Sequence, residues 1–173
     1  VEEIELNKYQ ELNKLFIGNA FVEYLALGKL KNIAYIASQR LNKISNGHYA
    51  LTVNESGDFL IIDNFNNGET RRSATLSGGE SFLVSLSLAL ALSSQIQLKS
   101  KSSLEFFFLD EGFGTLDNQL LDRVISSLES LRDNEKMNIG LITHVEELKE
   151  RVPRKLIVNP PISGECGTKV SLI

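Results

Sequence analysis

Four short segments of this sequence carry residue types that do chemistry on phosphates. They are TLSGGE at positions 75–80, LDE at 109–111, GTLD at 114–117 and TH at 143–144. Each segment borders an apolar run, so glycines, carboxylates and a histidine fall where helices begin and strands end. Ligand sites of α/β proteins lie at such positions, which predicts that these segments build the functional site.

Ser77-Gly78-Gly79 forms a glycine turn directly before a long apolar helix. Glycines let the backbone approach a ligand, Ser77 adds a hydroxyl group, and the helix dipole adds partial positive charge near a phosphate. Glu80 follows the glycines and no lysine does, so a phosphate held here would need a cation from elsewhere. The alternative is that Ser77 only caps the helix, and the turn by itself does not decide between the two.

Asp110 and Glu111 are adjacent carboxylates at the end of an apolar run that predicts a buried strand. Such a pair is costly to desolvate unless a metal, a water or a cation lies beside it. Asp110 could hold Mg²⁺ through its water shell, while Glu111 could orient or deprotonate an attacking water. The alternative is that the two carboxylates cap the next turn.

Asp117 and His144 complete the set of candidate residues. Asp117 follows a flexible turn that contains Gly112 and Gly114, and it could either cap its helix or reach across an interface. His144 ends the second apolar run, where a lone histidine is either structural or functional. His48 has no comparable neighbours in sequence, and we assign it no function.

The first 46 residues are expected to be helical. Periodic apolar residues predict a helix over 30–44, which Asn46-Gly47 closes. A further helix is expected upstream, with a break near Gly18 and with Asn19 able to cap the helix that follows. The two helices either pack on a core or belong to a coiled coil, and the heptads are too few to decide.

Downstream, strands alternate with helices, which predicts an α/β sheet. The helix after Gly79 is apolar nearly all round and should be buried, and the strand at 104–111 should be covered on both faces. The polar stretch 70–75 leads to the glycine turn. The expected elements are a hairpin over 49–62, the helix after Gly79, strands at 104–111 and 137–144, a helix over 117–131, a short helix over 145–151 stopped by Pro153, and strands at 155–158 and 168–173.

The composition predicts a folded chain, with 42% apolar and 23% charged residues. Cys166 is the single cysteine, so an internal disulfide is excluded and a reducing compartment is expected. The apolar run 82–92 is shorter than the roughly 20 residues that span a bilayer, so we expect no membrane span. Positions 1–12 lack the basic and apolar regions of a signal peptide.

The formal net charge of −4 is too mild to predict a partner, and it argues against a dedicated nucleic-acid coat. Two local basic spots, Arg71-Arg72 and positions 151–155, could still touch phosphate.

Together the four segments resemble the C-terminal half of an ABC-type ATPase head. LSGGE is similar to the signature motif, FFFLDE to the Walker B strand, GTLD to the D-loop and His144 to the switch histidine. The longer stretches LSGGESFLVSLSLALALSSQIQ and LEFFFLDEGFGTLD resemble the SbcC family, the SMC-like ATPase subunit of a DNA exonuclease that processes double-strand breaks and hairpins. The resemblance covers nearly the whole chain. It implies helices from the base of a coiled coil over 1–46, and over 47–173 an α/β lobe with a mostly parallel sheet and flanking helices.

The resemblance also implies a role for each candidate residue. In families of this type two heads sandwich two ATP molecules, so the glycine turn would bind the γ-phosphate of ATP held mainly by the opposite head. The missing cation would then be the Walker lysine and Mg²⁺ of that other head. The implied roles are ATP binding by Ser77, Gly78, Gly79, Glu80 and Asp117, Mg²⁺ binding by Asp110, and catalysis by Glu111 and His144.

No G-x-x-x-x-G-K-[ST] phosphate loop occurs in the sequence, and LGKL at 27–30 lacks its first glycine and its final hydroxyl. The chain is therefore expected to be one lobe of an ATPase that hydrolyses ATP only as part of a complete head dimer. The implied partners are the N-terminal lobe of the same protein, a second copy of the head, an SbcD-type nuclease subunit near the coiled-coil base and double-stranded DNA. A cytoplasmic, nucleoid-associated location is implied as well.

Two alternatives remain open. The lobe could belong to another SMC-like or recombination ATPase, or to a transporter, although transporters more often have glutamine where this chain has Glu80. It could also be a non-enzymatic module that docks DNA or a nuclease through residues 1–46. Such a module would not need the Asp110-Glu111 pair.

Overall fold

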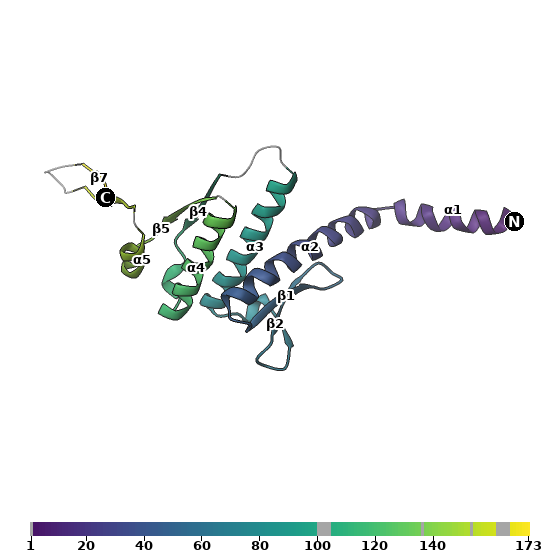
Figure 1. Ribbon diagram of the computed structural model, residues 1–173. Coiled ribbons are helices and arrows are strands. Elements are labelled where there is room, and N and C mark those ends of the chain that lie inside the picture. The colour runs from purple at the N-terminus through teal and green to yellow at the C-terminus, as the bar shows by residue number, and fades with distance from the viewer. Residues whose placement is uncertain (1, 100–104, 136, 153, 162–166) are drawn as a thin grey trace.

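The computed structural model describes residues 2–99, 105–135, 137–152, 154–161 and 167–173. The predictions for Cys166 and Pro153 lie outside these residues. The molecule is elongated, with α1 at one end and the β6–β7 hairpin at the other (Figure 1). The helices are α1 (Glu2–Phe16), α2 (Ala20–Ile44), α3 (Gly78–Lys99), α4 (Asn118–Glu135) and α5 (Glu146–Arg151). The strands are β1 (Tyr49–Val53), β2 (Phe59–Asp63), β3 (Glu69–Arg72), β4 (Phe106–Asp110), β5 (Asn138–Ile142), β6 (Leu156–Asn159) and β7 (Lys169–Leu172), with short 3-10 turns at Ser73–Thr75 and Phe113–Thr115.

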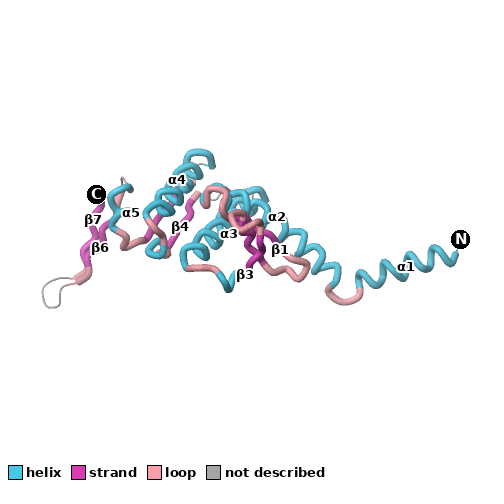
Figure 2. The backbone as a smooth tube through the Cα atoms, turned by 90° about the horizontal axis from the view of Figure 1, so that it is seen from below, coloured by secondary structure: helices cyan, strands magenta, loops and turns pink. Residues whose placement is uncertain are grey.

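α1 and the first turns of α2 form an N-terminal arm (residues 2–26) that projects from the rest of the chain (Figures 1 and 2). The break between the helices is near Gly18, as predicted, and Gly18 has a φ of 75°. Asn19 occupies the N-cap position of α2, but its side chain makes no capping hydrogen bond. The arm is rich in exposed apolar side chains, namely Ile4, Leu6, Tyr9, Phe16, Ile17, Phe21, Val22, Tyr24 and Leu25.

The last turns of α2 belong to the core of the body. Ala34, Ala37, Leu41 and Ile44 recur at helical spacing and are buried against α3 and β1. The helix ends as predicted, because Asn46 and the glycine after it adopt left-handed φ values of 55° and 82°. α2 therefore runs without interruption from the arm into the core, and the division of the chain at 46/47 stays a prediction.

β1, β2 and β3 form an antiparallel sheet in that order, and β1 packs on α2. The hairpin of β1 and β2 confirms the prediction for 49–62, with Leu51 opposite Ile61. β3 pairs with β2 and was not predicted. Its four residues are polar and exposed or half-buried, so β3 forms through backbone pairing at a sheet edge and leaves no apolar pattern in the sequence.

β4 and β5 form a parallel pair joined by α4, and Asp110 lies opposite Ile142 at its end. The prediction that β4 is covered on both faces is wrong for this chain. Phe106 and Phe108 are 57% and 68% exposed, whereas Phe107 between them packs against the core. A continuous apolar strand is typical of a sheet with two covered faces, and the part of this chain that the structure describes covers one of them.

α3 lies beside α2 at the centre of the body (Figure 1). Leu83, Leu86 and Leu90 are buried, but Leu92 and Ile96 are about half exposed, so its predicted burial holds for one side and not all round. Among the described helices, the segment Gly78–Gln97 is long and apolar enough to cross a membrane by length and composition, with 44% of its most apolar window buried. In this structure those buried residues belong to the shared core.

Replacing Leu41, which is fully buried, with alanine should lower the free energy of unfolding by about 3 kcal/mol, because it leaves a cavity between α2 and α3. The matched control is Leu25→Ala on the same helix, where a side chain 48% exposed should cost about 0.5 kcal/mol or less. Urea unfolding followed by circular dichroism measures both. Equal losses would show that α2 is not part of the core.

Candidate functional site

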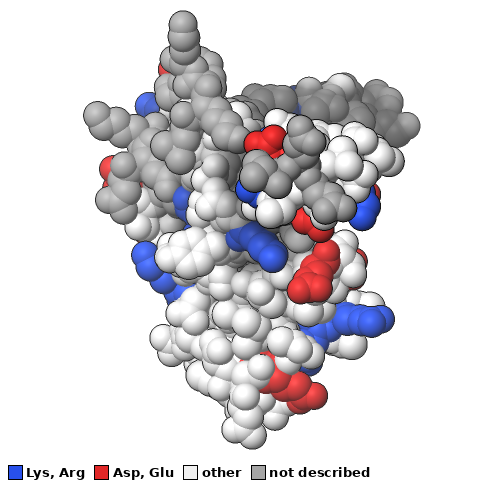
Figure 3. Space-filling model, turned by 90° about the vertical axis from the view of Figure 1, so that its right-hand side faces the viewer, with Lys and Arg blue, Asp and Glu red and all other residues white. Residues whose placement is uncertain are grey.

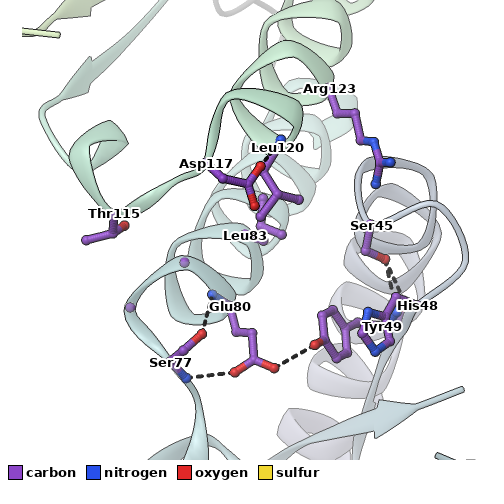
Figure 4. Close-up of a pocket in the computed structure, with 12 residues that line it drawn as sticks. Ser45, His48, Tyr49, Ser77, Glu80, Leu83, Thr115, Asp117, Leu120 and Arg123 are labelled. Carbon is purple, nitrogen blue, oxygen red and sulfur yellow. Dashed lines mark hydrogen bonds between the residues drawn. The ribbon is translucent and has the colours of Figure 1, made fainter. Parts of the chain in front are cut away.

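The eight candidate residues form two separate groups in the structure. Ser77, Gly78, Gly79, Glu80 and Asp117 line one cavity of about 710 Å³ between the start of α3, the start of α4 and the turn before β1 (Figure 4). Asp110, Glu111 and His144 lie at the carboxyl ends of β4 and β5 and are not among the residues that line it. All eight lie at element ends, as predicted, and the tertiary structure divides them between two places.

The glycine turn (residues 77–79) is held by a reciprocal pair of hydrogen bonds. The Ser77 N–H donates to Glu80 Oε2 over 2.7 Å, and the Glu80 N–H donates to Ser77 Oγ over 3.3 Å. Ser77 therefore caps α3, which is one of the two roles considered for it from the sequence. Because a hydroxyl both accepts and donates, Ser77 keeps its O–H proton available for a ligand. The first N–H groups of the helix have no partner within it, so the turn remains suited to an anion.

Glu80 also fixes the turn to the antiparallel sheet. Its Oε1 accepts a hydrogen bond of 2.6 Å from the Tyr49 hydroxyl and one of 2.8 Å from Arg71 Nη2. Arg71 Nη2 lies 3.5 Å from Asp63 as well. Both carboxylate oxygens of Glu80 are therefore engaged inside the protein, which gives this residue a role in holding the turn.

These contacts shift the pKa values of the two titratable partners in opposite directions. Burial raises the pKa of Glu80, but hydrogen bonds from Tyr49, from the Ser77 N–H and from Arg71 outweigh it and lower that pKa to about 2. Burial and the adjacent Glu80 carboxylate raise the pKa of Tyr49 to about 12. Glu80 is thus ionised and Tyr49 protonated over the whole physiological range.

The glycine turn packs directly on the 3-10 turn at Phe113–Thr115. A Cβ atom at Gly79 would lie 3.2 Å from the Thr115 carbonyl oxygen, a tight contact, so the close approach favours glycine. Asp117 follows this turn, and its Oδ1 accepts a hydrogen bond of 2.8 Å from the Leu120 N–H at the start of α4. Asp117 therefore caps its helix, one of its two predicted alternatives, while it lines the cavity.

Glu111 and His144 meet at the ends of the parallel strands, and we call them the carboxylate–histidine pair. His144 Nδ1 lies 3.0 Å from Glu111 Oε1. In the tautomer that carries its proton on Nδ1, His144 donates this hydrogen bond and the Glu111 carboxylate accepts it. Both side chains are exposed, at 55% for Glu111 and 74% for His144. The pair is therefore open to a ligand.

The backbone at Glu111 is in an uncommon conformation. Its φ is 59°, and its N–H donates to the Ile142 carbonyl over 2.8 Å. Gly112 follows with a φ of 93°, and a Cβ there would lie 2.7 Å from the Phe82 ring. Such conformations persist only where the surrounding structure enforces them, and they cluster at functional sites.

Asp110 is exposed beside this pair. No group of three or more His, Cys, Asp or Glu side chains in the described ranges could hold a metal ion by itself. Mg²⁺ is usually held by one or two carboxylates, with water and substrate phosphates as the other ligands. The Asp110 carboxylate therefore fits a Mg²⁺ that arrives with a nucleotide.

Three residues around the cavity were missed or misjudged from sequence. Arg71 was predicted as a possible phosphate contact, but it is engaged by Glu80 and Asp63. His48 received no function, yet it lines the cavity, with its ring stacked 3.9 Å from that of Tyr49. Arg123 lines the cavity too. No local motif marks His48 or Arg123, because each reaches the cavity from a separate element.

Charge does not gather into one basic surface on the face drawn in Figure 3, where positive and negative side chains are interspersed. Part of the predicted basic spot at 151–155 is neutralised, because Arg151 forms an ion pair with Asp122. Arg72 remains exposed.

Replacing Tyr49 with phenylalanine should lower the free energy of unfolding by about 2 kcal/mol at pH 7, because one hydrogen bond to the half-buried Glu80 carboxylate is lost. The folded pKa of Glu80 lies below its ordinary value of 4.5, so this carboxylate stabilises fully above pH 4.5 and progressively less as the pH falls toward 2.

The stability gap between the wild type and Tyr49→Phe should therefore narrow across the same interval. Urea unfolding at stepped pH values measures the gap, with Tyr35→Phe, an exposed tyrosine, as the control. A difference in unfolding free energy that stays constant down to pH 2 would contradict the lowered pKa of Glu80 and its hydrogen bond with Tyr49.

Comparison with known proteins identifies the family of this chain. The family described as "SbcC/RAD50-like, Walker B motif" matches residues 49–130. The SbcC subunit of the nuclease SbcCD from Clostridium acetobutylicum is 51% identical over 98% of this chain, and that from Bacillus subtilis is 49% identical over 98%. The chain spans 14% and 16% of the length of these two proteins.

The fold has close counterparts among solved structures. The Smc head domain of Pyrococcus furiosus, with an extended coiled coil and bound to the C-terminal domain of ScpA, superposes with a TM-score of 0.64 at 17% identity. That match covers 99% of this chain and 42% of the other. It confirms the expected fold, a lobe of an ATPase head. The chain belongs to the SbcC family.

Proposed function

We propose that this chain is half of an ATP-binding and ATP-hydrolysing head, and that ATP-dependent pairing of two heads controls the access of double-stranded DNA to a partner nuclease. The observation that supports this most directly is the separation of the glycine turn from the carboxylate–histidine pair. One lobe that carries two half-sites in different places can contribute to two composite sites, as a dimer of heads requires.

The glycine turn is proposed to act on the nucleotide of the opposite head. Ser77 offers its hydroxyl proton, and Gly78 and Gly79 offer backbone N–H groups at the positive end of the α3 dipole. Asp117 lines the same cavity and is proposed to contact that nucleotide or its head. Glu80 is proposed to contact the nucleotide as well, and it holds the turn in place by accepting hydrogen bonds from Tyr49 and Arg71.

The carboxylate–histidine pair is proposed to act on the nucleotide of its own head. Glu111 orients or deprotonates the attacking water, and His144 fixes the carboxylate through its Nδ1–H. Asp110 is the residue that would hold Mg²⁺, which neutralises charge on the transferred phosphate when bound. The left-handed backbone at Glu111 keeps its side chain at the strand end, beside His144.

The exposed apolar surfaces fit the proposed partners. The uncovered face of β4, with Phe106 and Phe108, suits the N-terminal lobe of the same protein, which would bring the phosphate loop. The N-terminal arm suits the base of a coiled coil and the docking of an SbcD-type nuclease, a partner that the name of the relatives' complex, SbcCD, supports. A cytoplasmic, nucleoid-associated location follows from a DNA substrate.

Glu111→Gln keeps the shape of the side chain and removes the base. In the complete head, this change should leave ATP binding and dimerisation intact and lower hydrolysis by roughly 10²-fold or more. Steady-state hydrolysis and nucleotide binding are measured on this chain combined with its N-terminal lobe, with Glu129→Gln on the surface of α4 as the control. Undiminished turnover would exclude Glu111 as the base.

Ser77→Arg fills the space in front of the glycine turn without removing a buried group. It should abolish the ATP-dependent dimer of complete heads while leaving the fold of each head unchanged. Sedimentation with and without ATP measures the dimer, and Ser126→Arg on α4 is the control. A normal dimer from Ser77→Arg would contradict the proposed role across the head interface.

A further inference from the structure

One basic side chain that lines the cavity beside the glycine turn, that of Arg123, has none of the roles proposed above. Arg123 lies on α4, one turn after Leu120, and lines the cavity together with Ser77 and the two glycines. It is half-buried, and it makes no hydrogen bond or ion pair with the other described residues. Figure 4 shows its side chain reaching from α4 into the space above Ser45 and His48.

The other charged groups around the cavity are already engaged. Glu80 is paired with Arg71 and accepts from Tyr49, and Asp117 accepts from the backbone of its own helix. Among the described residues that line this cavity, Arg123 is therefore the charged side chain left with unused hydrogen-bond donors. A guanidinium offers five donors in a planar fork that matches a phosphate, and it stays protonated at any physiological pH.

The position of Arg123 is set by the core and not by its own contacts. Leu121 and Val124 on either side are 3% and 0% exposed, so α4 cannot rotate about its axis without opening the core. The start of the same helix is fixed by the Asp117 cap. The backbone of Arg123 is thereby held at the cavity, which lowers the entropy cost of binding an anion there.

We propose that Arg123 is a nucleotide-binding residue that acts across the head interface. Its guanidinium binds the phosphate groups of the nucleoside triphosphate that the opposite head presents to the glycine turn. The turn supplies neutral donors and no lysine, and Arg123 supplies the charge from α4, another element that lines the same cavity. This inference rests on the proposed role of the turn across the interface.

The first test is ATP-dependent dimerisation of the full-length protein that carries Arg123→Gln. Loss of a charge-assisted hydrogen bond should raise the ATP concentration for half-maximal dimerisation roughly tenfold. Arg123→Lys should recover part of this loss because it restores the charge without the fork. Arg132→Gln is the matched control, since Arg132 lies on the same helix and pairs with Asp133.

The second test separates action across the interface from a structural effect. One mixed dimer has Arg123→Gln on one head and a substituted Walker lysine on the other, which leaves one composite site intact. The second mixed dimer has both substitutions on the same head, which leaves none intact. Hydrolysis should be higher in the first dimer. Equal rates, or a higher rate in the second, would overturn the proposal, because a folding defect affects both dimers alike.

The outcomes also separate this inference from the proposed function. If Ser77→Arg blocks the dimer while Arg123→Gln behaves like Arg132→Gln, the inference on Arg123 fails alone. If Ser77→Arg dimerises normally, the role of the whole turn fails and the inference fails with it. If Arg123→Gln leaves the ATP dependence unchanged and weakens binding to a DNA duplex, the phosphate belongs to DNA, and the proposal is overturned.

Discussion

The Glu80 carboxylate is the contact on which the geometry of the cavity depends. It accepts hydrogen bonds from the Tyr49 hydroxyl, the Arg71 guanidinium and the Ser77 N–H, so a single side chain joins β1, β3 and the start of α3. Hydrogen bonds from three directions offset the cost of partly burying this charge, and they lower the pKa of Glu80 to about 2. The glycine turn is consequently rigid before any ligand arrives, which is the condition for binding a phosphate with little loss of entropy.

This contact also connects the turn to the N-terminal arm. Tyr49 begins β1, shortly after α2 ends at Ile44, and α2 continues without a break from the arm into the core. The N-terminal arm is therefore connected to the glycine turn by α2, by the short loop before β1 and by the hydrogen bond of 2.6 Å between Tyr49 and Glu80. This path would link the proposed coiled coil to the surface that is proposed to face the second head.

A second constraint positions the carboxylate–histidine pair. The parallel register of β4 and β5 brings Asp110 level with Ile142, so the residues that follow each strand emerge side by side. Glu111 then turns through a left-handed conformation, and Gly112 passes against the ring of Phe82. Strand pairing and local backbone conformation thus align Glu111 with His144, while the core packing of α3 and α4 places the glycine turn and its cavity elsewhere.

Most elements, and the placement of the eight candidate residues at element ends, could be predicted from short windows of sequence. Helical periodicity located α2 and α4, apolar runs located β4 and β5, and residues such as Ser77, Glu111 and His144 were found at their ends, because propensity and motif spacing are local properties. Which of these residues meet depends on tertiary contacts instead. The bond from Tyr49 to Glu80 spans 31 positions, and that from His144 to Glu111 spans 33.

The edge strand β3, the open face of β4 and the presence of Arg123 at the cavity likewise arise from packing. Each depends on which distant segment lies next to it, and no short window of sequence contains that neighbour. Periodicity can tell that Leu121 and Val124 face a core, and hence that Arg123 between them does not. Periodicity cannot tell which residues lie opposite Arg123 across the cavity, because they come from the start of α3 and from the turn before β1.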